Sequence, residues 1–248
     1  MPQPVVLITG AAKRLGAQMS RHLHQLGYRL ILHYHHSETL AQALQQELNH
    51  LRPNSVQLLR QDLTQLEQLP AMADQVINCF GRLDGLINNA SSFYATPFGH
   101  SQPQQWQDLA STNAAAPYFL IQALADTLKK HQGAIINMVD IHAEKGLKDH
   151  LLYSMAKNAL ATLTRGLATE LAPNVRVNGI APGAIIWPEQ ELTSSQKEQV
   201  LTTIPLARLG TAQEIAKTVE FLLTGPRYLT GHIINLDGGR SSRGLVDA

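Results

Sequence analysis

The chain has little cysteine and no excess of charge of either sign. One cysteine among 248 residues excludes a disulfide within the chain, and a reducing compartment is the simplest setting for this lone thiol. The 20 basic and 19 acidic residues leave a net charge of +1, with no basic stripe and no acidic tail. These counts argue against a secreted disulfide scaffold and against electrostatic binding to nucleic acid.

Long apolar runs are missing as well. A membrane-spanning helix needs about 18 consecutive apolar residues, whereas the longest apolar segments here are short ones such as 134–139. The first residues, Met-Pro-Gln-Pro, have no basic segment and no long apolar one after it, so no secretory signal is expected. We therefore expect a soluble, cytoplasmic protein that binds neither membranes nor nucleic acids.

The chain does have a regular alternation of two patterns. Short β-branched segments predict strands at 5–9, 29–33, 56–59, 83–88, 134–139, 176–179 and 232–235. Apolar residues spaced three and four apart predict helices at 15–26, 38–51, 65–80, 104–131, 151–172 and 212–224. Thr211 and Glu214 form a capping box, and Ser101 before Pro103 marks a helix start. The alternation predicts one α/β domain over residues 1–248, a doubly wound parallel sheet of the Rossmann type.

One stretch, residues 182–205, breaks this alternation. A polar run in this stretch is interrupted and flanked by Pro182-Gly183, Trp187-Pro188 and Pro205. This pattern predicts a loop with one short helix. Connections this long in a compact domain are usually functional, so a lid over a binding site is the leading interpretation. The roles of Trp187 and Glu189 stay open, since Trp187 could serve packing within the lid alone.

The first strand leads into a helix through Thr-Gly-Ala-Ala-Lys-Arg-Leu-Gly, residues 9–16. Gly10 permits a tight turn, and Gly16 lets the helix pack closely on the strand, which aims the helix N-terminus at a pyrophosphate. The strand before and the helix after the glycines favour a dinucleotide site. Its candidate cofactor contacts in this loop are Gly10, Lys13, Arg14, Leu15 and Gly16.

The end of the second strand favours the phosphorylated cofactor. An NAD site usually has Asp or Glu about 20 residues past the glycines, but here the first carboxylate is Glu38. Hydrogen-bond donors at this point suit a 2′-phosphate, which predicts NADPH. The candidate contacts are Tyr34, His35, His36 and Ser37. Two alternatives remain: His33 and His35 could be strand side chains that share one face, or, less favoured because no further ligands are near, metal ligands.

Several motifs occur together and in order along nearly the whole chain. They are the glycine loop, Asn88-Asn89-Ala90, Tyr153-Ser-Met-Ala-Lys157, Pro182-Gly183 and Leu236-Asp237-Gly238-Gly239. Together they resemble the short-chain dehydrogenase/reductase family. The resemblance implies cofactor contacts from Asp62, Leu63, Asn89, Ala90, Ser91, Tyr153, Lys157, Pro182 and Gly183. It also implies that Asn113 helps to hold Lys157 through water, and that the protein is a homotetramer in contact through 104–131 and 151–172. A helix N-cap is the alternative role for Asp62.

Tyr153 and Lys157 are four residues apart on a predicted helix, so their side chains share a face. A free tyrosine has a pKa of about 10, too high for ready proton exchange at neutral pH. A cation about 4 Å away contributes roughly 4 kcal/mol at an effective dielectric of about 20, which would bring the pKa of the phenol to about 7. The spacing therefore predicts Tyr153 as a proton donor. The resemblance adds that Lys157 also reaches the nicotinamide ribose.

Thirteen residues before Tyr153 the family commonly has serine, and this chain has Asp140. A hydroxyl can donate a hydrogen bond to a substrate carbonyl, whereas an ionised carboxylate only accepts and repels a carbonyl oxygen. Asp140 therefore disfavours a simple ketone substrate and suits a ring that presents N–H or amino groups. With a raised pKa, Asp140 could also pass a proton to Tyr153.

Further features resemble the pteridine reductase branch of the family: Lys13-Arg14, His-Tyr-His before Ser37, Ser91-Ser92-Phe93-Tyr94 and Asp140. The branch often has arginine where this chain has His36. The resemblance implies an NADPH-dependent reductase that converts dihydropteridines, such as dihydrobiopterin, dihydromonapterin or dihydrofolate, to their tetrahydro forms. The substrate contacts so implied are Arg14, Ser91, Phe93, Asp140 and Tyr153. Phe93 would stack on the ring, and its alternative role is a loop aromatic anchored in the core.

Two other functions remain possible. One is a generic NADPH-dependent carbonyl reductase, for example of acyl-carrier ketones, which would share the cofactor site and change the substrate. The other is a non-catalytic nucleotide sensor, which would need the glycine loop and not the pairing of Tyr153 with Lys157.

Overall fold

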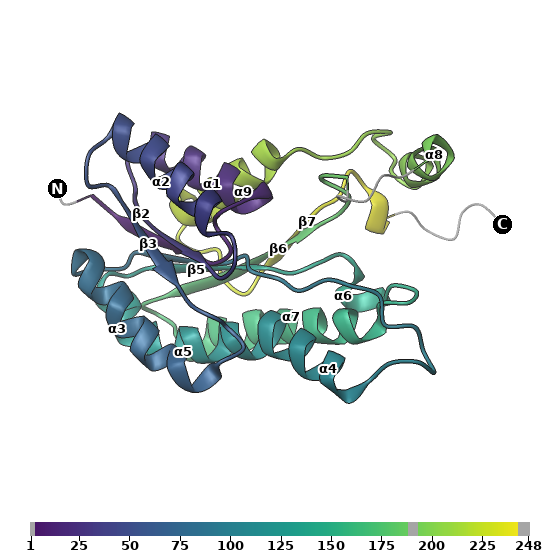
Figure 1. The fold of residues 1–248 in the computed structure, drawn as a ribbon, viewed down its shortest axis with the longest axis horizontal. Coiled ribbons are helices and arrows are strands. Elements are labelled where there is room, and N and C mark those ends of the chain that lie inside the picture. Colours follow the sequence, from purple (N-terminus) through teal and green to yellow (C-terminus); the bar gives the residue numbers. More distant parts are fainter. Residues whose placement is uncertain (1–2, 188–192, 243–248) are drawn as a thin grey trace.

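A computed structural model describes residues 3–187 and 193–242 (Figure 1). Its sheet has seven parallel strands in the order β3-β2-β1-β4-β5-β6-β7. The strands are β1 (Val5–Ile8), β2 (Arg29–Tyr34), β3 (Val56–Arg60), β4 (Gly85–Asn88), β5 (Ala134–Met138), β6 (Arg176–Pro182) and β7 (Ile233–Leu236). The order reverses direction at β1, which opens a crevice at the carboxyl ends of the strands. The predicted doubly wound Rossmann fold is confirmed.

Helices cover both faces of the sheet (Figure 1). One face carries α1 (Arg14–Gln25), α2 (Glu38–Leu51) and α9 (Ala212–Thr224). The other carries α3 (Leu69–Phe80), α4 (Pro103–Ala110), α5 (Ala116–Lys130) and α7 (Leu151–Glu170). Shorter elements are α6 (His142–Lys145), α8 (Ser194–Thr202) and the 3₁₀ turns Leu66–Gln68 and Arg240–Ser242. No helix within the described residues is long and apolar enough to cross a membrane.

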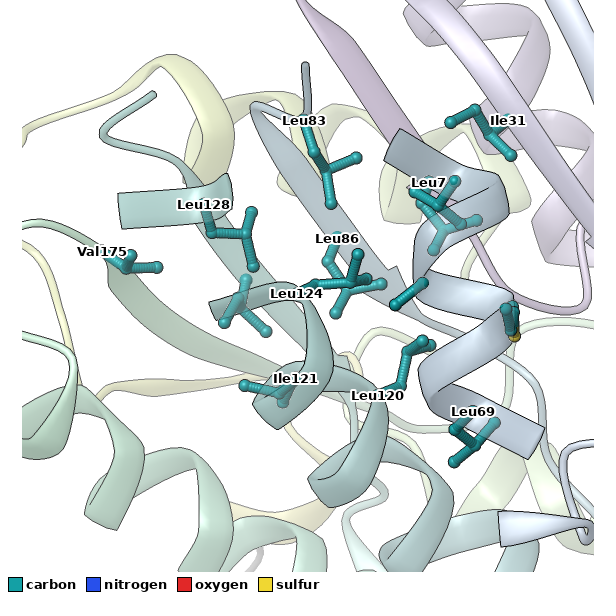
Figure 2. Close-up of a cluster of buried hydrophobic side chains, with 14 of the residues drawn as sticks. Leu7, Ile31, Leu69, Leu83, Leu86, Leu120, Ile121, Leu124, Leu128 and Val175 are labelled. Atoms are coloured by element: carbon teal, nitrogen blue, oxygen red, sulfur yellow. The ribbon is translucent and has the colours of Figure 1, made fainter. Parts of the chain in front are cut away.

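The core consists of one large apolar cluster on each face of the sheet. Figure 2 shows the cluster in which Leu120 and Leu124 of α5 pack with Leu86 of β4 and Leu7 of β1. All four residues are 0–1% exposed. Burying side chains of this size stabilises the fold by about 1.5–3 kcal/mol each. This packing fixes the strand ends, where the candidate site lies.

The predicted helix at 104–131 differs from the structure at its centre. A π-helical turn at Ser111–Ala115 separates α4 from α5. Pro117 has no backbone N–H, so it cannot make the ordinary α-helical hydrogen bond to the carbonyl of Asn113. The turn therefore falls at Asn113, one of the predicted site residues.

The predicted N-terminal cap is confirmed for α9 and differs for α4. The capping box of Thr211 and Glu214 at the start of α9 is confirmed. The expected start at Ser101 is wrong, because Gln102 is the N-cap of α4 and its backbone N–H donates to Gln105 Oε1 at 2.8 Å. The Ser101 hydroxyl instead donates to the carbonyl of Pro97 at 3.1 Å.

The stretch 182–205 has the predicted form of a loop with one short helix, α8, within its described part; residues 188–192, including Glu189, lie outside the described residues. In Figure 1, α8 lies beyond the carboxyl ends of β6 and β7. The chain returns to the start of the stretch shortly after its end, since the Gly210 N–H donates to the Ala184 carbonyl at 3.0 Å.

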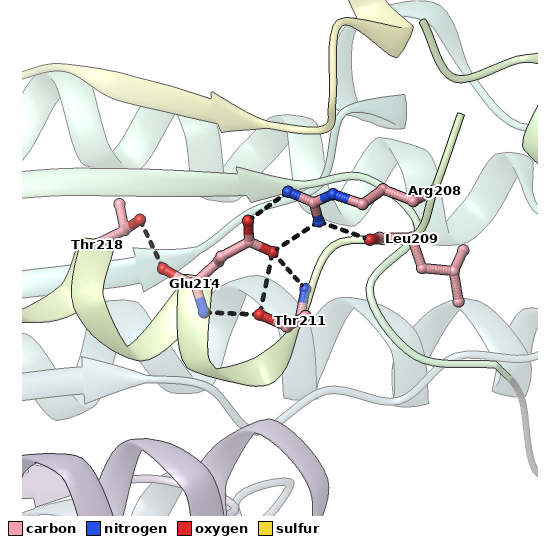
Figure 3. A network of polar contacts seen from close by, with 5 residues as sticks. All are labelled: Arg208, Leu209, Thr211, Glu214 and Thr218. Carbon is pink, nitrogen blue, oxygen red and sulfur yellow. Dashed lines mark hydrogen bonds and ion pairs between the residues drawn. The ribbon is translucent and has the colours of Figure 1, made fainter. Parts of the chain in front are cut away.

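An ion pair fixes the chain where this stretch ends. Arg208 Nη2 lies 2.8 Å from Glu214 Oε1, next to the capping hydrogen bonds of Thr211 (Figure 3). The Arg208 guanidinium, together with the bonds from Thr211, lowers the pKa of Glu214 to about 2. The chain that follows residues 182–205 is thereby tied to the start of α9.

Candidate active site

Two adjoining cavities, of about 630 and 220 Å³, lie at the carboxyl ends of the strands. Arg14, Leu15, Asn89 and Ser91 line both of them. The larger cavity is also bordered by the predicted residues Gly10, Lys13, Gly16, His35, His36, Ser37, Asp62, Leu63 and Ala90. The smaller is also bordered by Asp140, Tyr153, Lys157, Pro182 and Gly183. Nearly all the predicted site residues therefore border one cleft of the size usual for ligand sites.

The glycine loop has the geometry that a pyrophosphate requires. Gly10 has a φ of +61°, and a Cβ on Gly16 would lie 2.3 Å from the Gly10 carbonyl oxygen. The loop delivers the N-terminus of α1 to the larger cavity, and no acidic residue occupies the first turn of α1. Because the first amides of a helix lack helical partners, this terminus suits an anion. The residues present thus fit a dinucleotide phosphate group.

Arg14 occupies an unusual backbone conformation. Its φ is +52°, in the left-handed region that favours glycine. Its guanidinium approaches the Trp187 carbonyl, with a distance of 3.4 Å from Nη2 to the oxygen. A costly conformation at a site residue points to a functional constraint on that side chain.

Thr9 and Asn89 tie the glycine loop to the end of β4. The Thr9 hydroxyl oxygen accepts hydrogen bonds from the backbone N–H groups of Asn89 and Ala90, at 2.9 and 3.0 Å. Asn89 Nδ2 donates to the carbonyls of Thr9 and Gly10 at 2.9 and 3.0 Å. The role of Thr9 was not predicted, although its threonine-glycine pair is the available signal in the sequence.

His33 also supports the loop. Its Nδ1 accepts from the Gly10 N–H at 3.1 Å, and its Nε2 donates to the Gln61 carbonyl at 2.9 Å. The side chain is 2% exposed. Strand alternation turns His33 and His35 to one side and Tyr34 to the other. The Tyr34 side chain is buried with Ala12 and Ala41, and its contact with the cofactor stays a prediction.

The buried imidazole of His33 makes stability depend on pH. Burial lowers the pKa of His33 to about 4 in the folded protein, whereas an unfolded histidine titrates near ~6.5. Between these two pKa values the His33 imidazole is protonated in the unfolded chain and neutral in the folded chain. The free energy of unfolding therefore decreases as the pH drops from about 6.5 toward 4. When the pH is lowered from 7 to 5, the free energy of unfolding should decrease in the wild type. In His33→Gln we expect this decrease to be smaller by about 2 kcal/mol. Urea titrations at both pH values measure this, and equal losses would contradict it.

The far end of the larger cavity is basic. The rings of His35 and His36 have centroids 3.5 Å apart, and His35 Nε2 lies 3.9 Å from Asp62 Oδ2. Asp62 Oδ1 accepts from the N–H of Thr64 at 2.9 Å. The alternative reading of Asp62 as a helix N-cap is wrong, because Gln65 holds that position. The polar side chains that border this end of the cavity include His35, His36 and Asp62.

The smaller cavity brings together Asp140, Tyr153 and Lys157. The Tyr153 hydroxyl donates to Asp140 Oδ2 at 2.9 Å, and the His142 N–H donates to Asp140 Oδ1 at 2.8 Å. Lys157 Nζ donates to the Met138 carbonyl at 2.8 Å. Tyr153 and Lys157 are 5% and 2% exposed. The site therefore presents a phenol held between a carboxylate and an ammonium.

The expected lowering of the Tyr153 pKa is wrong for this structure. Burial and then the Asp140 carboxylate raise the pKa of Tyr153 well above its usual range. The ammonium of Lys157 lies 5.8 Å from the centre of the phenol ring, and burial lowers its own pKa to about 8. A lowered pKa would require a cation at about 4 Å from the phenol oxygen and no carboxylate hydrogen-bonded to it. The phenol thus holds its proton at neutral pH.

Asn113 connects to the site through Ser91. The Ser91 hydroxyl donates to Asn113 Oδ1 at 2.6 Å. Asn113 Nδ2 donates to the carbonyls of Leu109 and Ser92 at 2.9 and 3.0 Å. The nearby Ser91 side chain lowers the pKa of Tyr153, although less than burial and Asp140 raise it. That Asn113 also holds Lys157 through water stays a prediction.

Phe93 lies beside Tyr153 at the edge of the site. The two ring centroids are 4.8 Å apart, and the ring planes meet at 79°. Phe93 is 56% exposed, so the alternative that it is anchored in the core is wrong. Its exposed surface is available for stacking.

Comparison with known proteins gives consistent matches over most of the chain. A family model described as Enoyl-(Acyl carrier protein) reductase matches residues 10–241. A pteridine reductase 1 of Leishmania tarentolae is 38% identical, with 96% of each chain covered. A 3-oxoacyl-(acyl-carrier-protein) reductase of Staphylococcus aureus is 33% identical, with 94% of this chain and 96% of its own covered. An uncharacterized oxidoreductase of Bacillus subtilis is 32% identical, with 94% and 97% covered.

These matches agree with the parallel sheet, the glycine loop and the cavity formed around Tyr153 and Lys157. The resemblance to the pteridine reductase branch is supported by a relative bearing that name. The chain therefore belongs to the short-chain dehydrogenase/reductase family, whose oxidoreductases use a nicotinamide cofactor.

Proposed function

We propose that the protein is an NADPH-dependent pteridine reductase, which reduces dihydropteridines such as dihydrobiopterin, dihydromonapterin or dihydrofolate to tetrahydro forms. The observation that carries this proposal is the 2.9 Å hydrogen bond from Tyr153 to Asp140 within the smaller cavity. A carboxylate beside the proton donor favours a substrate with N–H or amino groups over one with a bare carbonyl oxygen. The 38% identity to a pteridine reductase supports the same substrate class.

In this proposal the protein binds, orients and protonates the ring. A nicotinamide held in this cleft would provide the hydride that a ring carbon accepts. Tyr153 would supply a proton to the adjacent ring nitrogen, so that the C=N bond gains one hydride and one proton and becomes a CH–NH single bond. Asp140 accepts a hydrogen bond from the ring, and the ammonium of Lys157 offsets charge left on the phenol. Arg14, Ser91 and Phe93 complete the substrate contacts.

NADPH is the proposed cofactor because side chains that can donate hydrogen bonds border the far end of the larger cavity. Lys13, His35, His36 and Ser37 border the space that a 2′-phosphate would enter. Glu38, the nearest carboxylate along β2 toward α2, is engaged at 3.9 Å with Arg60. This set of groups suits a phosphate dianion better than a ribose hydroxyl.

We further propose that residues 182–205 form a lid and that the protein is a cytoplasmic homotetramer. Ile185 and Ile186 border the smaller cavity, which supports the lid. Trp106, Tyr118 and Phe119 of α4 and α5 are 37–43% exposed, which supports subunit contacts on that face.

A substrate panel tests the proposed function. Loss of NADPH absorbance is measured with a dihydropteridine, dihydrofolate and a 3-oxoacyl thioester, each with NADPH and with NADH. We expect turnover of the pteridines with kcat/KM at least about tenfold higher for NADPH. Because a 3-oxoacyl reductase is also 33% identical, turnover of the thioester alone would replace the proposal with carbonyl reduction. No turnover of any compound would favour a nucleotide sensor.

A further inference from the structure

A histidine outside the predicted site lies against the exposed aromatic ring of Phe93. The rings of His150 and Phe93 are stacked, with centroids 4.6 Å apart and planes 10° from parallel. Phe93 also meets Tyr153 almost perpendicularly at 4.8 Å. His150 and Tyr153 are three residues apart at the start of α7, so both rings project from the same side of the helix.

The backbone and the ring of His150 are both held in place. Its N–H donates to the Leu147 carbonyl at 3.0 Å, and its carbonyl accepts from the Ser154 N–H at 3.0 Å. The Ser154 hydroxyl accepts from the Leu147 N–H at 3.0 Å, which fixes the turn before α7. His150 Nδ1 lies 2.9 Å from the Lys148 carbonyl, and because a carbonyl can only accept, this nitrogen carries the proton. The imidazole plane is thereby set by the fold rather than by the substrate.

Phe93 has less support of its own. It lies in the loop between β4 and α4 and is 56% exposed. A large, exposed ring on a loop would otherwise sample several rotamers. The imidazole of His150 covers one face of the Phe93 ring, and Tyr153 meets that ring at an angle. The opposite face of Phe93 is therefore directed away from His150.

We propose that His150 is a positioning residue that holds Phe93 as a platform, so that a flat substrate ring stacks as the outer layer over Phe93 and His150. This inference rests on the proposed function, since it assumes a planar heterocycle. Offset aromatic stacks contribute about 0.5–1.5 kcal/mol, which corresponds to about two- to tenfold in binding. His150 should therefore act on substrate affinity and leave the proton transfer by Tyr153 unchanged.

A double-mutant cycle tests the proposal. We expect His150→Ala to raise KM for dihydrobiopterin about two- to tenfold, with kcat and the Kd of NADPH changed less than twofold. His150→Phe, which keeps a flat ring, should restore KM. In a Phe93→Ala background, His150→Ala should have no further effect, because His150 acts through Phe93. Additive effects of the two substitutions, or no effect of His150→Ala, would overturn the proposal. His100→Ala, at an exposed histidine, is the matched control.

A second readout does not depend on activity. In the free protein, the ring current of Phe93 should shift the imidazole C–H resonances of His150, and Phe93→Leu should remove that shift. Unchanged resonances would overturn the stacking itself. If the wild type turns over no pteridine while the ring-current shift is present, the proposed function fails and the positioning of Phe93 stands.

Discussion

Replacing Asp140 with serine should lower kcat for a dihydropteridine by about 100-fold, the scale at which a positioned proton-transfer group contributes. Asp140 accepts the Tyr153 hydroxyl at 2.9 Å and is held by the His142 N–H at 2.8 Å. Serine has one neutral oxygen in place of two charged ones, so its hydrogen bonds with Tyr153 and with a ring N–H would be weaker than those of the carboxylate. Steady-state turnover of dihydrobiopterin with NADPH measures the effect, and full activity would contradict the role assigned to the carboxylate.

A spectroscopic measurement separates this effect from simple damage to the fold. Because the Asp140 carboxylate helps to raise the pKa of Tyr153, Asp140→Ser should lower the pH at which the phenol ionises, as followed by ultraviolet absorbance. The same substitution of Asp140 in a Tyr153→Phe background should leave the absorbance titration unchanged, which assigns the shifted titration to the Tyr153 phenol. Tyr153→Phe should also lose turnover of every substrate, because it lacks the proton. An unchanged titration would mean that Asp140 does not act on Tyr153.

Replacing Gly16 with alanine should abolish cofactor binding. The added Cβ would lie 2.3 Å from the Gly10 carbonyl oxygen and 2.8 Å from the Ala11 Cα, and both are backbone atoms that cannot move alone. Overpacking of this kind costs about 1–3 kcal/mol or more, and it displaces the loop at the N-terminus of α1. We expect the free energy of unfolding to be lower by about 2–4 kcal/mol. We also expect NADPH binding, measured by calorimetry, to be at least about 100-fold weaker, because the displaced loop carries the anion site with it.

Gly166→Ala is the matched control for this substitution. Gly166 lies within α7, is exposed, and has no atom within 4 Å of an added Cβ. Because alanine has the higher helix propensity, this variant should be more stable by about 0.5–1 kcal/mol and should bind NADPH normally. Equal NADPH affinity of Gly16→Ala and the wild type would contradict the proposed role of the close contact.

The fold could be predicted from the sequence because its signals are local and repeated. The buried strand β1 is a continuous apolar run, and the helices between the strands carry apolar stripes. The capping box of Thr211 and Glu214 is a pattern four residues long. The π-turn at Asn113 was missed, since it depends on the missing N–H of Pro117 within an otherwise uninterrupted helical pattern.

The site was predicted where a motif names its residues and missed where contacts join distant parts of the chain. The residues around Gly10, Asn89 and Tyr153 border the cleft as expected. The direction of the Tyr153 pKa was wrong, because it depends on burial and on a 2.9 Å contact with Asp140 that spacing cannot give. The support of Gly10 by His33 across 23 residues of chain was likewise missed.

A crystal structure of the protein with NADP⁺ and a dihydropteridine would test most directly whether Asp140 recognises the substrate. We predict that the Asp140 carboxylate, held at 2.9 Å from the Tyr153 hydroxyl, lies within hydrogen-bond distance of a ring N–H or amino group. A carboxylate that points away from the bound ring, with no hydrogen bond to it, would contradict the account.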